Sequence, residues 1–154
     1  MAFLSSFNIP VSGMTAERFR FDIISHNITN AEDYATRPED VFKRQMTVFG
    51  EDRSFKSMLR QNLQSGELDW SRFNYIQLKG VEATRVVEDP TPPTPVYSPD
   101  NPLADEFGYI YKTNVNLVVE QADAIAAVNS YNANKEIFDL MKTMATAALN
   151  IGKG

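Results

Sequence analysis

The residues that could carry out chemistry in this sequence are few and poorly grouped. His26 is the sole histidine and lies at the end of a helix-like apolar stretch, where a surface or capping role is expected rather than catalysis. Acidic residues cluster once, in a predicted loop, at Glu32, Asp33, Glu39 and Asp40. Their spacing lacks the ordered oxygen ligands and the turn glycine of a calcium loop. We therefore expect a solvated loop and no metal site.

No other segment supplies the groups of an active site. The stretches GELDWSRF (66–73) and DNPLADEFGY (100–109) contain carboxylates without a paired base. No glycine-rich loop could cradle a phosphate, and the scarce glycines mark turns. The sequence therefore predicts neither a catalytic residue nor a cofactor.

The overall composition limits the classes of partner. The chain has 154 residues, a net charge of −5 and a pI near 4.9, so nucleic acid and anionic membranes are not expected to bind it. Cysteine is absent, which excludes disulfides and thiolate metal sites. The N-terminal stretch lacks the features of a cleaved secretory signal, and no apolar run is long enough to span a membrane. If the protein leaves the cytoplasm, we expect a route that keeps its N-terminus in place.

An amphipathic helix is predicted near the N-terminus. Pro10 is compatible only with the start of a helix, so we expect the helix to run from about Ser12 to Asn30. Ser12 is then the N-cap, and Asn30 lies in the C-cap region. The apolar face of this helix is interrupted by Arg18 and Ser25 and consists of Phe7, Val11, Met14, Phe21 and Ile28.

The middle of the chain has the patterns of loops and strands. Residues 34–40 are polar and contain a proline, which predicts a loop, and FKRQMTVFG (42–50) alternates as a strand does. Residues 75–89 are rich in β-branched side chains and predict strands with a bulge or turn at Gly80. Between them, a short helix is weakly indicated by Phe55, Met58, Leu59 and Leu63.

A proline-rich segment follows these strands. PTPPTPVYSPDNP (90–102) contains six prolines, which exclude both a helix and a central strand. We expect an extended, polyproline-like connector that acts as a stiff spacer. A docking motif for a proline-binding domain is the alternative.

One long helix is predicted from about residue 116 to residue 151. This stretch has no proline or glycine and abundant alanine, and at 1.5 Å per residue it would measure roughly 50 Å. An apolar stripe with coiled-coil spacing, here named the C-terminal seam, is formed by Ile137, Leu140, Met144, Ala147 and Ile151 and is traced back through Ala133, Ala126, Ala122 and Val119. The step between Ala133 and Ile137 is a stutter, which locally unwinds a coiled coil.

The C-terminal seam is too long for the small middle segment to cover. The N-terminal helix can cover part of it, but that helix is much shorter, so the rest would stay uncovered in a single chain. We therefore expect other copies or other chains to complete the packing.

Two stretches near the ends of the chain resemble signatures of the flagellar rod and hook family of axial proteins. SHNITNAEDY (25–34) resembles the family pattern S-x-N-[LI]-x-N-A, with Thr29 replacing the usual alanine and matches at Ser25, Asn27, Ile28, Asn30 and Ala31. SYNANKEIF (130–138) is similar to the pattern S-Y-x-A-N-x-E, with matches at Ser130, Tyr131, Ala133, Asn134 and Glu136.

A third segment is similar to the proximal-rod members of that family in particular. SPDNPLADEFGYIYKTNVNLVVE (98–120) looks like the segment that leads into their C-terminal helix, with matches at Asn101, Pro102, Leu103, Ala104, Asp105, Gly108, Tyr109, Asn114 and Val115. The resemblance covers roughly residues 7–49 and 80–152, whereas residues 50–75 do not match the family pattern.

The resemblance implies an axial structural protein of the bacterial flagellum. Such a protein is a subunit of the proximal rod in the basal body and assembles with copies of itself and with other rod proteins into the drive shaft that carries motor torque towards the hook. It travels unfolded through the flagellar type III export machinery, and its terminal regions fold into packed helices on assembly. Another rod protein of the same family and a non-flagellar coiled-coil adaptor are the alternatives, and an enzyme ranks third.

The expected architecture is mainly α with a small β-rich middle segment. We divide the chain into an N-terminal helical arm (1–33), a β-rich middle with the proline-rich connector (34–115) and a C-terminal long helix (116–154). The terminal helices are expected to pack as a coiled-coil-like layer in an assembly. The predicted subunit-interface residues are Asn27, Ile28, Asn30, Ala31, Ala122, Ala126, Tyr131, Asn134, Ile137, Leu140, Met144 and Ile151.

The asparagines of the N-terminal signature allow two interpretations. In the first, Asn30 closes the helix in left-handed geometry and Asn27 makes a local hydrogen bond. In the second, Asn27 and Asn134 face neighbouring helices and fix their register, because a polar group in an apolar seam penalises alignments that leave it unpaired. We favour a mixture, with Asn30 as a cap and Asn27 as a register residue.

Overall fold

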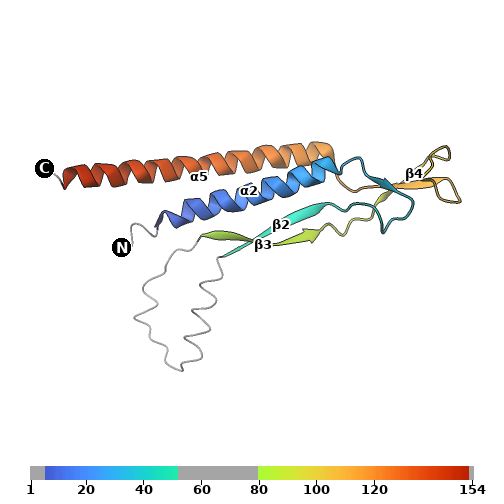
Figure 1. Ribbon diagram of the computed structural model, residues 1–154, viewed down its shortest axis with the longest axis horizontal. Coiled ribbons are helices and arrows are strands. Elements are labelled where there is room, and N and C mark those ends of the chain that lie inside the picture. Colours follow the sequence, from blue (N-terminus) through green and yellow to red (C-terminus); the bar gives the residue numbers. More distant parts are fainter. Residues whose placement is uncertain (1–5, 52–79, 153–154) are drawn as a thin grey trace, which may run out of the picture.

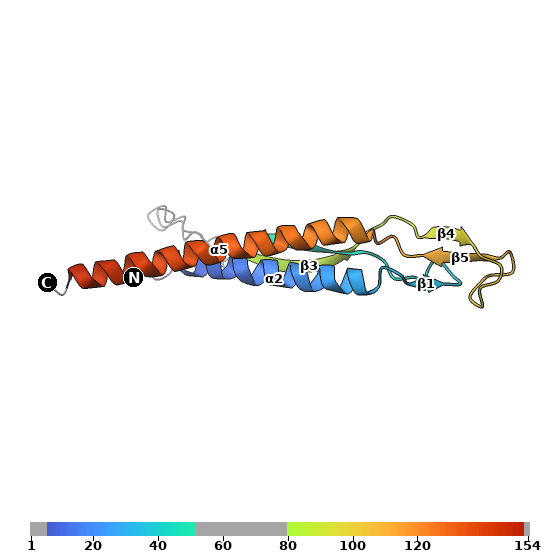
Figure 2. The same cartoon turned by 90° about the horizontal axis from the view of Figure 1, so that it is seen from above.

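Two long antiparallel helices form most of the computed structural model, which describes residues 6–51 and 80–152. Helix α2 (Asn8–Thr29) and helix α5 (Leu117–Ile151) lie side by side in both Figure 1 and Figure 2. Two small antiparallel sheets complete the described part of the chain. The prediction of a mainly α fold with a β-rich middle segment and packed terminal helices is confirmed.

Helix α2 begins earlier than predicted. Its first residue is Asn8, its N-cap is Phe7, and no side chain caps it. Pro10 occupies the first turn, where a missing N–H breaks no helical hydrogen bond. The prediction of Ser12 as N-cap was therefore wrong: its hydroxyl donates to the Ile9 carbonyl at 2.7 Å and accepts the Val81 N–H at 3.1 Å.

The other helix ends agree better with the sequence. Asn30 is the C-cap of α2, and its side-chain amide donates to the His26 carbonyl at 2.8 Å. Its φ of −101° is not left-handed, so that part of the prediction was wrong. Helix α5 starts after Asn116, whose side chain accepts hydrogen bonds from the N–H groups of Val118 and Val119, as an N-cap should.

A two-stranded sheet covers the side of α2 opposite α5. Strand β2 (Gln45–Glu51) pairs with β3 (Val81–Glu88) in a register that runs from Gln45 opposite Glu88 to Glu51 opposite Val81, with one shift between Val48 and Phe49. Figure 1 shows the order α5, α2 and then the β2–β3 sheet. Helix α2 is thus the middle layer.

A three-stranded sheet lies beyond the helix pair, at the end opposite the C-terminus (Figure 2). Its order is β1 (Tyr34–Ala35), β5 (Tyr109–Lys112) and β4 (Thr94–Tyr97). Two predictions need correction here, because the predicted loop 34–40 contains β1 and the predicted polyproline connector contains β4. The prolines still have the expected effect, since β4 is an edge strand and not a central one.

Some predictions fall on residues that the structure does not describe. The short helix suggested by Phe55, Met58, Leu59 and Leu63 lies outside the described residues, as does the part of the predicted strand before Gly80. Within residues 6–51 and 80–152, no helix is long and apolar enough to cross a membrane. The three-part division of the chain stays a prediction.

Candidate assembly interface

Small and polar side chains fill the contact between α2 and α5. On α2 the buried positions are Pro10, Gly13, Ala16, Ile24 and Asn27. On α5 the two buried residues are Glu120 and Ala127, seven positions apart, and Asn134 follows after another seven. Apart from Ile24, the buried residues of the two helices are small or polar.

Large apolar side chains point away from this contact. Every residue of the C-terminal seam is exposed, and the exposed fractions of Ile137, Leu140 and Ile151 are 50%, 61% and 83%. Val11 and Phe21 of the predicted apolar face of α2 are each 41% exposed. The expectation that α2 covers part of the C-terminal seam was therefore wrong. Both faces of α5 have heptad spacing, so periodicity alone did not show which one meets α2.

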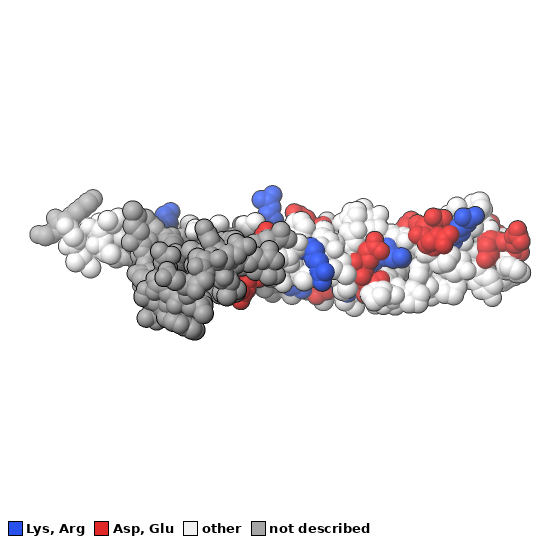
Figure 3. Space-filling model, turned by 90° about the horizontal axis from the view of Figure 1, so that it is seen from below, with Lys and Arg blue, Asp and Glu red and all other residues white. Residues whose placement is uncertain are grey.

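The last third of α5 extends past the start of α2. The rings of Phe7 and Phe138 meet edge to face with centroids 5.6 Å apart, which places the N-cap of α2 beside this point of α5. Helix α5 continues from residue 139 to residue 151, about 20 Å at 1.5 Å per residue. We call residues 139–151 the overhang. Figure 3 shows the molecule from below, and on that face the coloured charged side chains gather mainly towards the end that carries the β1–β5–β4 sheet.

A buried polar cluster joins α2, α5 and the start of β2. The amide nitrogen of Asn27 donates to Oε2 of Glu120 at 2.9 Å and to the Gln45 carbonyl at 2.8 Å. The amide oxygen of Asn27 accepts the Gln45 N–H at 2.9 Å. Both Asn27 and Glu120 have exposed fractions of 0%. Asn27 therefore bonds to distant segments, and the interpretation that it makes only a local bond was wrong.

Arg44 supplies the positive charge of this cluster. Its Nε lies 2.5 Å from Oε1 of Glu120, and its Nη2 lies 3.0 Å from Oδ2 of Asp123. Partial burial by itself would lower the pKa of Arg44, but the bond to Glu120 and the charges of Glu120, Asp123 and Asp89 outweigh this and raise it. The guanidinium stays charged. We use the name polar cluster for Asn27, Arg44, Glu120 and Asp123.

Two further residues hold the polar cluster in place. Asn114 accepts the backbone N–H of Arg44 at 2.8 Å and donates to the Thr91 carbonyl at 3.0 Å. Arg20 of α2 donates to Asp123 at 3.3 Å. The groups of the polar cluster are thus occupied by one another, and the arrangement positions helices rather than activating a reactant. Asn27 and Asn114 are recognisable from the sequence, whereas Arg44 and Glu120 are not, since charges 76 positions apart give no local signal.

The remaining predicted interface residues fall into two groups. Ala31 is buried, whereas Ile28, Asn30 and Asn134 are half-buried. The exposed group consists of Ala122, Ala126, Tyr131, Ile137, Leu140, Met144 and Ile151. Contact with another subunit stays a prediction for both groups. Among the described residues, no group of histidines and carboxylates could hold a metal ion.

Comparison with known proteins identifies full-length relatives, although no family model matches the chain. The chain is 33% identical over 158 residues to the flagellar basal-body rod protein FlgC of Borreliella burgdorferi and covers 100% of both chains. It is 31% identical over 161 residues to FlgC of Bacillus subtilis, covering 99% of this chain and 100% of that one. FlgC of Buchnera aphidicola is 29% identical over 153 residues, with the same coverage.

Proposed function

Because the chain belongs to the FlgC family of flagellar basal-body rod proteins and is a structural subunit of that rod, we propose that it joins its neighbours through the C-terminal seam. The observation that carries this proposal is the outward position of the whole seam on α5. A contiguous apolar stripe of this kind marks an interaction surface.

The energetics favour such a contact. Full burial of Ile137, Leu140 or Met144 from a fully exposed state is worth roughly 1.5–3 kcal/mol each. These residues are 50%, 61% and 56% exposed, so much of this free energy is not realised within one chain. A repeated helical assembly would gain it once for every subunit.

The partners follow from this arrangement and the family. We expect copies of this chain and other rod proteins to cover the seam, and we expect the flagellar type III export machinery to deliver the chain. The overhang, most of whose side chains are exposed, would fold stably only when a neighbour packs on it, because a helix segment with little burial is marginal in water. The assembled rod would then carry motor torque towards the hook.

The test is a Leu140→Asp substitution in cells that lack their own copy of this protein. The new carboxylate would enter the proposed contact. Lys142 is the sole basic residue between 139 and 152, and it does not lie on the seam, so it cannot offset the charge there. We expect the variant to be made and exported, while electron microscopy of basal bodies shows rods that stop at the proximal part. Immunoblots measure export.

Asn132→Asp is the matched control, because it adds the same charge to an exposed position of α5 that is not on the seam. Complete rods in the control and truncated rods in Leu140→Asp support the proposal. Complete rods in both variants would refute it. Under the alternative of a soluble adaptor, both variants would leave the rod intact.

A further inference from the structure

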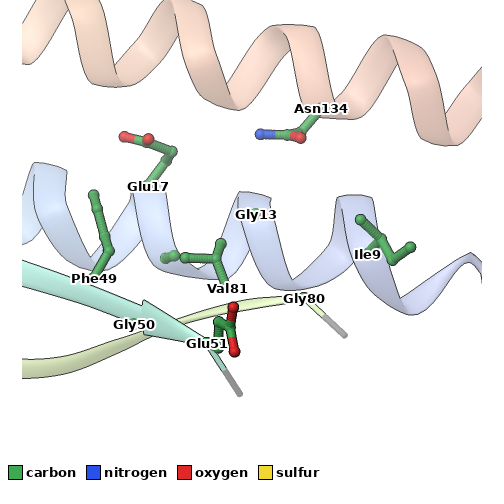
Figure 4. Close-up of a pocket in the computed structure, with 10 residues that line it drawn as sticks. Ile9, Gly13, Glu17, Phe49, Gly50, Glu51, Gly80, Val81 and Asn134 are labelled. Atoms are coloured by element: carbon green, nitrogen blue, oxygen red, sulfur yellow. The ribbon is translucent and has the colours of Figure 1, made fainter. Parts of the chain in front are cut away.

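The contact between α2 and α5 has two fixed points at matching intervals. One is the hydrogen bond from Asn27 to Glu120. The other is the close approach of Gly13 to Asn134, where a Cβ added to Gly13 would lie 2.9 Å from the side-chain Cγ, Oδ1 and Nδ2 of Asn134. Figure 4 shows Asn134 pointing from α5 towards Gly13.

The spacing of these points is the same on both helices. From 13 to 27 on α2 and from 120 to 134 on α5 there are fourteen positions in each case, which is two heptads and about 21 Å. Because the helices are antiparallel, both points are satisfied by one alignment. We propose that these two contacts together fix a single register of α2 against α5 and thereby keep the C-terminal seam facing outward.

A slipped alignment would lose both contacts. Glu120 is fully buried, so moving Asn27 away by one turn would remove one of its hydrogen-bond donors. At the other point, α2 would bring a residue with a side chain against Asn134, in place of Gly13. Asn27 requires a hydrogen-bonding partner on α5, whereas Gly13 requires that no side chain lie between α2 and Asn134. The two restrictions are therefore independent.

The register matters because α5 has two faces that could meet α2. The C-terminal seam is the more apolar face, and burial of apolar area alone would turn it inward. The carboxylate of Glu120 accepts the amide of Asn27 only when this face meets α2. The amide of Asn134 donates to the Ser130 carbonyl of its own helix at 3.0 Å, and its close fit against Gly13 also requires this face. The role of the outward face in assembly rests on the proposed function, whereas the register itself does not.

Crosslinking can measure the register directly, because the chain has no cysteine of its own. Since Cγ of Asn134 is bonded to its Cβ, cysteines at 13 and 134 would place their Cβ atoms within the span of a disulfide, about 3.5–4.5 Å. The reporter is the full-length chain with Gly13→Cys and Asn134→Cys, oxidised mildly in dilute solution. The two cysteines replace the contact between Gly13 and Asn134, so the hydrogen bond from Asn27 to Glu120 is the one that remains to fix the register.

Three variants of the reporter test the remaining point. Asn27→Asp sets a carboxylate against Glu120 and should lower the crosslinked fraction several-fold. Adding Glu120→Gln removes the repulsion and lets an amide at 120 donate to the carboxylate at 27, so it should recover part of the crosslink, while the bond to the Gln45 carbonyl stays lost. Asn8→Asp makes the same chemical change at an exposed position of α2 and should have no effect.

The second fixed point is tested without the reporter. Gly13→Ala raises helix propensity, so it should stabilise the chain if Gly13 has no packing role. We expect the opposite: a lowered unfolding midpoint, restored when Asn134→Ala is added. The proposal would be overturned if the crosslink never forms or if Asn27→Asp leaves it unchanged. It would also be overturned if the double exchange does not restore part of the crosslink, or if Gly13→Ala stabilises the chain. None of these measurements requires a rod.

Discussion

Nε of Arg44 lies 2.5 Å from Oε1 of Glu120, a carboxylate with no exposed surface. Arg44 immediately precedes β2, and Glu120 is in the first turn of α5. The pair therefore ties the β2–β3 sheet to a helix that is not its immediate neighbour in the layer order.

Arg44→Met should lower the free energy of unfolding by about 3–5 kcal/mol, because it leaves a buried carboxylate without its charge partner. Denaturant unfolding of the full-length chain measures this change. The double variant Arg44→Met, Glu120→Leu should recover most of the loss, since neither charge then remains buried without its partner. An unchanged midpoint for Arg44→Met would show that Glu120 does not depend on this arginine.

Ala126 and Ala127 are adjacent in sequence, but Ala126 is exposed and Ala127 is buried. Ala127 is 1% exposed against α2, so Ala127→Leu should overpack the chain itself and destabilise it by about 1–3 kcal/mol. Ala126 is exposed on the C-terminal seam, so Ala126→Leu should leave the unfolding midpoint of the single chain unchanged and impair rod assembly. Unfolding curves together with micrographs of basal bodies separate the two effects. Normal rods with Ala126→Leu would argue against close packing at this face.

Amide exchange should vary along α5 in the isolated chain. Residues near Glu120 and Ala127 are held by the polar cluster and by α2, so we expect slow exchange there. Residues 139–151 extend past α2 and should exchange much faster. Hydrogen–deuterium exchange at low protein concentration measures this difference. Uniformly slow exchange from residue 117 to residue 151 would contradict the expected instability of the overhang.

Acid should weaken one contact at the edge of the polar cluster. Hydrogen bonds from the hydroxyl and the backbone N–H of Thr91, and then the charge of Arg44, lower the pKa of Asp89 below its ordinary value of 3.8. A lowered pKa means that the carboxylate stabilises the fold above the ordinary pKa and that this contribution is lost as the pH falls through the folded value. Asp89→Asn should therefore lower the melting temperature near neutral pH. The difference from the unsubstituted chain should shrink as the pH falls below the ordinary value of 3.8, and a constant difference would contradict this assignment.

The long helix could be predicted from the sequence because its signals are local. Its length follows from 35 residues without proline or glycine, and its start follows from Asn116. The orientation of α5 could not be predicted in this way, because it depends on Glu120 meeting Arg44 and Asn27 across the fold. Strand β4 could not be predicted for a related reason. Pro95 argues against a strand, and the pairing of β4 with β5 is not visible in the local sequence.

The start of α2 shows the limits of capping rules. Ser12 has the side chain of an N-cap, yet its hydroxyl contacts the first residue of β3, which lies 69 positions away. A residue that is capable of capping was used for a tertiary contact. The capping rule correctly predicted that the Ser12 hydroxyl accepts a backbone N–H, but that N–H belongs to Val81 and not to the first turn of α2.

The β1–β5–β4 sheet restricts how copies of this chain can associate. One open edge is β1, which has only two residues, and the other is β4, in which Pro95 offers no N–H. Neither edge is a good template for adding a strand from another molecule. We therefore do not expect copies of this chain to join by strand addition at either edge of this sheet.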